Sequence, residues 1–164
     1  MRIGQGYDVH KLLKSGGALV LGGVHIPFDY GLVGHSDADV AVHALIDAIL
    51  GALGLGDIGL IFPDNSDEYL GISSLLLLER VRDMMISKGY SVGNADITIV
   101  AQLPKIMPFA YEMRSNIAKA LRTDITRISV KATTEEGLGF TGRGEGIAAH
   151  AVVLLEEKNE SEQS

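Results

Sequence analysis

The chain alternates between segments with the spacing of β-strands and segments with the spacing of α-helices. Short apolar runs, which are typical of strands, occupy residues 2–9, 96–102, 127–133 and 147–155. Longer segments with helical periodicity lie between them, at residues 40–50, 73–88 and 109–121. This alternation predicts an α/β (α+β) fold, a ferredoxin-like sandwich in which helices pack on one face of a mixed β-sheet.

Residues 18–27 add a short N-terminal β-hairpin to this prediction. Two apolar runs there are joined by Gly22 and Gly23, a pair that tolerates the positive φ angles of a tight turn. The helix that follows needs an N-cap, and Ser36 or Asp37 is the expected residue.

The composition excludes several classes of protein. With 14 Lys and Arg against 21 Asp and Glu, the net charge is −7, which argues against a nucleic-acid partner. The chain has no cysteine, so any metal must be held by His and carboxylate ligands. The sequence has no 18-residue apolar run and no apolar signal-peptide core, so we expect a cytoplasmic protein without membrane association. A length of 164 residues favours one domain, expected over residues 1–156, with a polar, disordered tail over 157–164.

Two glycine-rich segments match G-x-G-x-x-G, at residues 54–59 and 137–142. The dinucleotide-binding motif also requires a strand before the glycines and a helix after them. The first match follows a predicted helix, and the second follows Glu135 and Glu136, whose charges would repel a pyrophosphate. A nucleotide cofactor is therefore disfavoured.

Asp8 and His10 stand two positions apart in the first predicted strand, so both side chains point to the same face. Two interpretations remain: a hydrogen-bonded structural pair, or two ligands of a metal ion. A metal would need a third ligand, and His43 is a candidate. His43 lies in a predicted helix with Asp39 and Asp47 four residues to either side, where a carboxylate could orient its ring.

Five stretches of the chain resemble one family. They span residues 2–148 in family order and read "RIGQGYDVH", "GHSDADVAVHALIDA", "GDIGLIFPD", "AQLPKIMP" and "KATTEEGLGFTGRGEGIA". The chain is similar to the 2-C-methyl-D-erythritol 2,4-cyclodiphosphate synthase family of the non-mevalonate isoprenoid pathway. The resemblance implies a lyase that cyclises 4-diphosphocytidyl-2-C-methyl-D-erythritol 2-phosphate with release of CMP, by metal-assisted attack of the 2-phosphate on the β-phosphorus.

The resemblance also implies the metals and the catalytic groups. Asp8, His10 and His43 match zinc ligands, with one zinc ion per subunit. Glu136 matches the ligand of a second divalent ion, Mg²⁺ or Mn²⁺, that arrives with substrate, although Glu135 stands beside it in the same turn. His35 and Thr134 are the expected catalytic residues, because they match donors of hydrogen bonds to the reacting phosphates.

The expected substrate contacts form three groups: residues at the metal, residues around the methylerythritol part, and residues around the cytidine and diphosphate. They are Asp8, His10, His35, Ser36, Asp57, Ile58, Gly59, Phe62, Pro63, Asp64, Asn65, Ser66, Ala101, Gln102, Leu103, Pro104, Lys105, Ile106, Met107, Thr133, Thr134, Glu135, Glu136, Phe140 and Arg143.

The same resemblance implies a homotrimer with active sites at the subunit interfaces. It places Arg143 and Glu145 near a central cavity on the threefold axis that would accept an isoprenoid diphosphate. Two other functions fit the same residues: a metal-dependent phosphohydrolase, and a non-catalytic trimer that binds a nucleotide or isoprenoid.

Overall fold

Two sheets form the framework of the protein in a computed structural model that describes residues 1–63, 65 and 67–158. The larger sheet has the order β4-β1-β7-β5-β6, and the smaller one pairs β2 with β3. The strands are β1 (Arg2–Leu13), β2 (Leu19–Leu21), β3 (Val24–Ile26), β4 (Gly31–Val33), β5 (Tyr90–Val100), β6 (Ile128–Thr133) and β7 (Gly146–Glu157). All pairings are antiparallel except that of β5 with β6, which is parallel.

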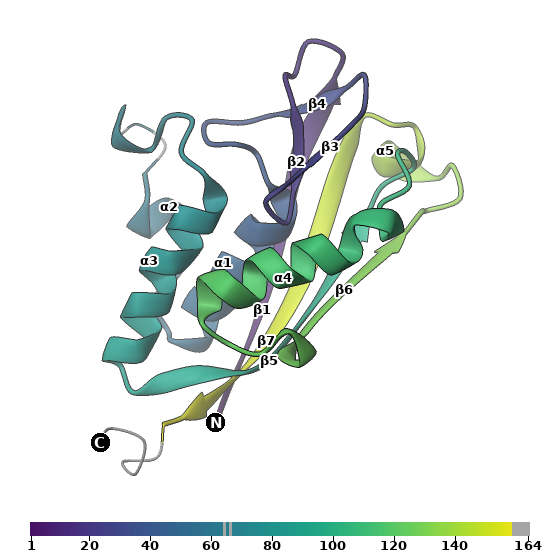
Figure 1. The fold of residues 1–164 in the computed structure, drawn as a ribbon. Helices are drawn as coiled ribbons and strands as arrows, with labels where there is room; N and C mark the ends of the chain where they lie inside the picture. Colours follow the sequence, from purple (N-terminus) through teal and green to yellow (C-terminus); the bar gives the residue numbers. More distant parts are fainter. Residues whose placement is uncertain (64, 66, 159–164) are drawn as a thin grey trace.

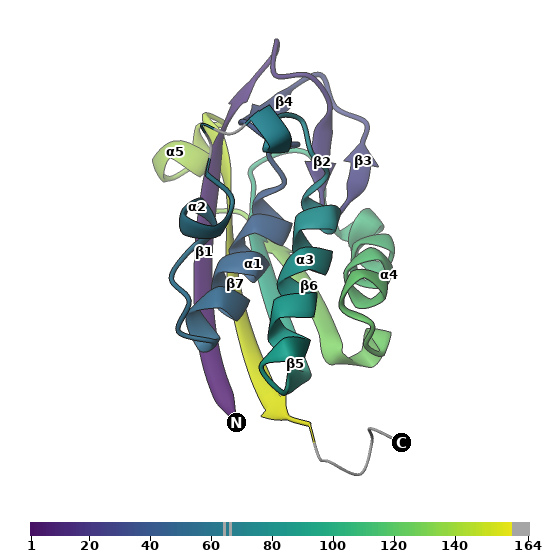
Figure 2. The ribbon, with the colours of Figure 1, turned by 90° about the vertical axis from the view of Figure 1, so that its left-hand side faces the viewer.

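The longer helices cover one face of the larger sheet (Figures 1 and 2). The helices are α1 (Val40–Ala52), α2 (Ile58–Ile61), α3 (Ser74–Ser87), α4 (Ala110–Leu121) and α5 (Gly139–Gly142). Helix α1 packs on β1 and β7, α4 packs on β6, and α3 lies between α1 and α4. Single 3₁₀ turns occupy Asp67–Tyr69, Met107–Phe109 and Ile125–Arg127.

Two glycines of β1 allow α1 to lie directly on the strand. A Cβ atom at Gly4 would come within 1.8 Å of the Ala48 carbonyl oxygen, and one at Gly6 within 1.9 Å of the Ala44 carbonyl oxygen. Any side chain at these positions would therefore push the helix away. Because Gly4 lies against Ala48 and Gly6 against Ala44, α1 runs along the strand and its N-terminal half brings His43 beside Asp8.

The predicted class of fold is confirmed, with differences at some boundaries. The mixed sheet, the helical face and the hairpin turn at Gly22 and Gly23 are present, and both glycines have positive φ. The strand predicted over residues 2–9 continues to Leu13. The ferredoxin-like label is not confirmed: β7 separates β1 from β5, but β5 and β6 are direct neighbours, so only one of the two βαβ units is split.

The predicted caps of α1 were wrong. The N-cap is Asp39, whose Oδ1 accepts a hydrogen bond from the Val42 N–H at 3.1 Å. Asp37 instead accepts the N–H of Ser74 at 2.9 Å and so caps α3. The sequence could not distinguish the two aspartates, because the partner of Asp37 lies on a different helix.

The C-terminal strand extends into the segment that was predicted to be a disordered tail. Glu157, in the predicted tail, is the last residue of β7, and the Lys158 N–H donates to the Gly89 carbonyl at 2.9 Å. The rest of that tail, residues 159–164, lies outside the described part of the chain. Within the described residues, no helix has the length and apolar character needed to cross a membrane.

Candidate metal centre and substrate cavities

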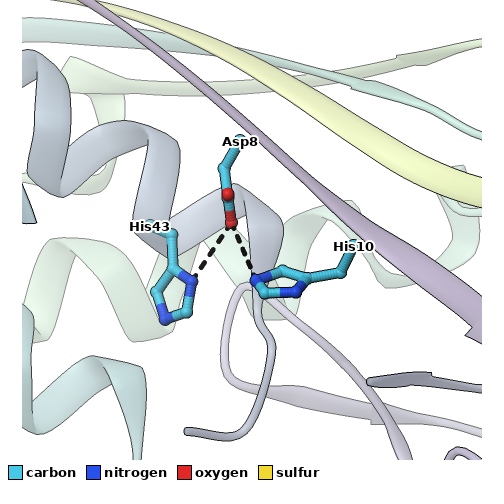
Figure 3. Close-up of side chains that lie close together, drawn as sticks. All are labelled: Asp8, His10 and His43. Carbon is cyan, nitrogen blue, oxygen red and sulfur yellow. Dashed lines mark hydrogen bonds and ion pairs between the residues drawn. The ribbon is translucent and has the colours of Figure 1, made fainter. Parts of the chain in front are cut away.

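Asp8, His10 and His43 converge at the junction of β1 and α1 (Figure 3). The Asp8 Oδ2 atom lies 3.2 Å from His10 Nε2 and 3.1 Å from His43 Nδ1. One ligand atom from each residue falls within 4.8 Å of the others. The third ligand that the sequence left open is therefore placed beside the first two by the packing of α1 on β1.

The electrostatics of Asp8 favour a permanent carboxylate. Burial alone would raise the pKa of this carboxyl, but the hydrogen bonds with His10 and His43 outweigh burial and lower the pKa to about 2. Asp8 is therefore negatively charged throughout the neutral pH range. A carboxylate between two imidazoles can hold a divalent cation.

The hydrogen bonds of the rings fit such a cation. His10 Nδ1 lies 2.9 Å from the Val33 carbonyl oxygen, which can only accept, so Nδ1 carries the proton of the neutral ring. A metal ion bound by His10 Nε2 and Asp8 Oδ2, which lie 3.2 Å apart, would replace any proton that these two atoms share. His43 Nε2 lies 2.8 Å from Ser74 Oγ and 3.0 Å from Ser36 Oγ, which leaves Nδ1 toward Asp8. Both rings thus present a ligand nitrogen to the cluster while the other nitrogen is hydrogen-bonded.

The cluster lines a cavity of about 160 Å³. The loop before α1 contributes His35 and Ser36, and α2 contributes Ile58 and Gly59. Phe62 closes the same cavity, and Tyr69 and Leu77, which the sequence did not indicate, complete its wall. The cavity therefore combines charged ligands, small polar donors and an apolar wall.

Asp57, the N-cap of α2, directly precedes the lining residue Ile58 but does not itself line this cavity. Its Oδ1 accepts the Leu60 N–H at 3.0 Å, and Asp47 Oδ1 holds α2 to α1 by accepting the Ile58 N–H at 2.7 Å. Pro63 and Asn65 follow as exposed residues. Asp64 and Ser66, also predicted to contact substrate, lie outside the described residues.

A second cavity, of about 290 Å³, lies where β5 and β6 end side by side. Its lining includes Thr133 and Thr134. It also includes six of the seven residues in the range 101–107, namely Ala101, Gln102, Pro104, Lys105, Ile106 and Met107. Leu103 faces a different hollow, shared with Phe28, Tyr30 and Arg143. The second cavity has no lining residue in common with the metal-cluster cavity.

Glu135 and Glu136, in the turn after β6, make different hydrogen bonds. Glu135 accepts a short hydrogen bond from Thr141 Oγ1. Glu136 has a positive φ of 53°, and its N–H donates to Thr134 Oγ1 at 3.2 Å. Both glutamates line a hollow with Thr134. Glu135 is therefore tied to its own turn, whereas the Glu136 backbone is held by the turn and its side chain is exposed.

The remaining predicted residues lie in and just after α5 and line other hollows. Phe140 lines a hollow with His10 and Glu145. Arg143 forms a two-point ion pair with Glu145, with N–O distances of 2.9 and 3.2 Å. In the single chain, these residues therefore lie outside the metal-cluster cavity, apart from His10, which reaches both.

Sequence reasoning missed Ser74 and misplaced the carboxylate that acts on His43. Asp39 accepts backbone N–H groups of Gly22, Gly23 and Val42, and Asp47 accepts that of Ile58. The ring of His43 is hydrogen-bonded instead by Ser36 and by Ser74, which is fully buried on α3. No local pattern signals Ser74, because it stands 31 residues from His43.

Comparisons with known proteins agree with the resemblance of the five stretches. A family model described as the YgbB family matches residues 1–156. A relative from Pelobacter propionicus, named 2-C-methyl-D-erythritol 2,4-cyclodiphosphate synthase, is 63% identical over 155 residues, which cover 94% of this chain and 98% of the relative.

Two solved structures are similar over 96% of this chain. The bifunctional IspDF from Campylobacter jejuni has a TM-score of 0.92 and 45% identity, and the match covers 42% of its longer chain. An IspF from Plasmodium falciparum, solved as a CDP complex, has a TM-score of 0.85 and 42% identity over 97% of its chain. The chain belongs to the YgbB family and is an enzyme of the 2-C-methyl-D-erythritol 2,4-cyclodiphosphate synthase type.

Proposed function

We propose that the enzyme cyclises 4-diphosphocytidyl-2-C-methyl-D-erythritol 2-phosphate to 2-C-methyl-D-erythritol 2,4-cyclodiphosphate. An oxygen of the 2-phosphate forms a bond to the β-phosphorus, and the bond from that phosphorus to the bridging oxygen breaks, so that CMP leaves with the bridging oxygen. The observation that carries this proposal is the convergence of Asp8, His10 and His43 on one cavity in a member of this family.

The ligand set supports zinc as the metal, one ion per subunit. Two imidazole nitrogens, one carboxylate oxygen and no cysteine suit Zn²⁺ with a free coordination position. When bound, such an ion would neutralise phosphate charge and polarise the phosphoryl group under attack. The chain itself holds Asp8 charged and keeps both rings oriented, so the site is organised for the ion by its own hydrogen bonds.

The other residues of this cavity would bind and orient the reacting end of the substrate. His35 and Ser36 stand beside the cluster, where they would donate hydrogen bonds to the phosphates. Asp57, with Ile58 and Gly59 beside it, would accept bonds from the methylerythritol hydroxyls. Holding the 2-phosphate here removes much of the entropy cost of ring closure.

The second cavity would hold the cytidine and the diphosphate. The CDP complex of the similar Plasmodium falciparum protein supports a cytidine nucleotide as ligand. Lys105 supplies a positive charge for the diphosphate, and Thr134 can donate its hydroxyl proton outward, because its oxygen accepts the Glu136 N–H. Glu136 would hold the second divalent ion, Mg²⁺ or Mn²⁺, since Glu135 is bonded to Thr141.

We further propose that residues 1–156 form one catalytic domain that works as a homotrimer, with each active site shared by two subunits. Two observations support the assembly. The metal-cluster cavity and the second cavity have separate linings. The sheet face opposite the helices exposes Ile3, Tyr7, Val9 and Val152, an apolar surface that a second copy would cover. Arg143 and Glu145 would then flank a central cavity able to take an isoprenoid diphosphate.

Complementation between two inactive variants tests both the reaction and the shared site. His43→Ala removes a metal ligand, and Thr133→Trp fills the second cavity. Each variant alone should fail to release CMP. Co-expressed as mixed trimers, they should recover about one quarter of wild-type activity, because about one site in four pairs an intact half from each variant.

The products decide between the proposed function and its alternatives. Cyclic diphosphate with CMP supports the cyclisation, whereas a linear hydrolysed phosphate would identify a phosphohydrolase. Stoichiometric binding without turnover would identify a non-catalytic binding protein. Absence of recovery in the mixed trimers, with an active wild type, would place both halves of the site in one subunit.

A further inference from the structure

Three residues from three segments form a hydrogen-bonded chain that ends on His43. His43 on α1 has its Nε2 atom 2.8 Å from Ser74 Oγ, at the first residue of α3. The Ser74 hydroxyl makes a short hydrogen bond to Asp37 Oδ1, in the loop before α1. Asp37 Oδ2 also accepts the Ser74 N–H at 2.9 Å. These hydrogen bonds, which we call the relay, thus join a candidate metal ligand to a carboxylate that is not itself a ligand.

The donor and acceptor in each hydrogen bond of the relay follow from the number of protons that the three side chains carry. A carboxylate only accepts hydrogen bonds, so Ser74 must donate its single hydroxyl proton to Asp37. Ser74 Oγ can then only accept from His43, which places the proton of the neutral imidazole on Nε2. With its proton on Nε2, the neutral ring offers the lone pair of Nδ1 to a metal ion held beside Asp8 Oδ2, 3.1 Å away, and that ion would replace any proton shared by the two atoms.

Ser36 alone would not fix this direction. Its Oγ lies 3.0 Å from His43 Nε2 and also accepts the Ala38 N–H at 3.4 Å. Ser36 lines the cavity, and its hydroxyl proton is not committed to a carboxylate by any hydrogen bond among the described residues. A hydroxyl of this kind can donate to Nε2 as readily as it can accept from it.

We propose that Asp37 and Ser74 are positioning residues that hold His43 in the tautomer and ring orientation needed to bind the metal through Nδ1. The proposal rests on the metal centre of the proposed function. The location of the relay supports it: Ser74 is fully buried, and the carboxylate of Asp37 sits at the N-terminus of α3, where the helix dipole stabilises negative charge. The tautomer of His10 is fixed in a similar way, by the hydrogen bond from its Nδ1 atom to the backbone carbonyl of Val33.

Two substitutions test the relay in different ways. Ser74→Ala removes the acceptor but leaves Ser36, so we expect about tenfold weaker zinc binding. Asp37→Asn keeps the size and still accepts the Ser74 N–H through its amide oxygen. Its amide nitrogen would then donate to Ser74 Oγ and turn the hydroxyl proton toward His43 Nε2. That reversal favours the wrong tautomer, and we expect about 100-fold weaker binding.

The matched control is Ser73→Ala, which removes the serine hydroxyl of the preceding residue. Ser73 is the exposed N-cap of α3 and makes no capping hydrogen bond through its side chain. Zinc affinity should be measured for the full-length protein by competition with a chromophoric chelator, with the absorption spectrum of the Co²⁺ form as a second readout. The melting temperature of the metal-free protein reports any purely structural effect.

Weaker zinc binding in both variants, a changed Co²⁺ spectrum and an unchanged control would support the relay. Affinities within about twofold of the wild type in both variants would overturn it, even if the melting temperature fell. Should Ser74→Ala fail to fold, Asp37→Asn decides the question by itself. A wild-type protein that binds no zinc would instead overturn the metal centre on which the relay depends.

Discussion

The two cavities of the chain are built in different ways. The metal-cluster cavity is lined by β1, the loop before α1, α1 itself, α2 and α3, and α1 is buried along almost its whole length. The second cavity is lined by the end of β6 and by the segments that follow β5 and β6, where the lining residue Met107 is 55% exposed. Folding of one chain therefore brings Asp8, His10 and His43 together, whereas the second cavity remains an open surface.

This difference comes from the anchoring of α1. Gly4 and Gly6 let the helix touch β1, and Asp39 fixes its N-terminus to the hairpin through the N–H groups of Gly22 and Gly23, at 2.9 and 2.7 Å. His43 therefore has little freedom relative to Asp8. A site assembled in this way should be sensitive both to loss of a ligand and to loss of an anchor.

The largest effect should come from removing the ligand on the helix. His43→Ala is expected to lose the bound zinc and to lower the rate of CMP release by at least about 10³-fold, since metal-ion stabilisation contributes several kcal/mol. Metal content and CMP release are measured on the same sample. His25→Ala, an exposed histidine on β3, is the control. Full zinc occupancy with unchanged turnover in His43→Ala would contradict the ligand assignment.

The anchor can be tested through pH. Burial raises the pKa of Asp39 to about 6, although the N–H groups of Gly23, Gly22 and Val42 oppose the shift, and the nearby charge of Asp37 adds to it. Because the folded pKa exceeds the unfolded value of 3.8, the contribution of Asp39 to stability is complete below about pH 4 and is lost as pH rises through 6. The loss amounts to at most about 3 kcal/mol.

Asp39→Asn should therefore remove a fall in the free energy of unfolding between pH 4 and pH 6, as followed by urea denaturation at each pH. Asp8 does not interfere in this window. Its pKa is lowered to about 2, so its contribution is present above about pH 4 and lost only as pH falls further. Parallel pH profiles for the wild type and Asp39→Asn would show that Asp39 is not a buried, titrating anchor.

A smaller pair of effects should separate the two cavities kinetically. His35→Ala is expected to lower kcat by about 10²-fold with zinc retained, because in the proposed function His35 donates a hydrogen bond to the reacting phosphates. Lys105→Met should mainly raise KM, by about tenfold, because in the proposed function Lys105 makes one charged contact with the diphosphate. Loss of zinc from His35→Ala would identify His35 as a metal ligand. An unchanged KM in Lys105→Met would show that Lys105 does not bind the substrate.

Much of the fold follows from patterns within single segments. The hairpin at Gly22 and Gly23, the helix over residues 73–88, the second half of β5 and the strands β6 and β7 were predicted from local residues. The cap of α1 was not, because Asp37 and Asp39 are equally good N-caps by type. The outcome depended on Ser74, whose N–H and hydroxyl occupy Asp37.

The sequence by itself determined the chemistry that is available: a chain without cysteine, with Asp8 and His10 on one face of a strand and His43 on a helix, in stretches that resemble one family. Only the tertiary structure decided which of these groups meet. A strand fixes the direction of its own side chains by its period of two, so Asp8 and His10 were readable as a pair. The positions of His43, Ser74 and Asp37 relative to that pair depend on helix packing across long stretches of chain, which no local pattern encodes.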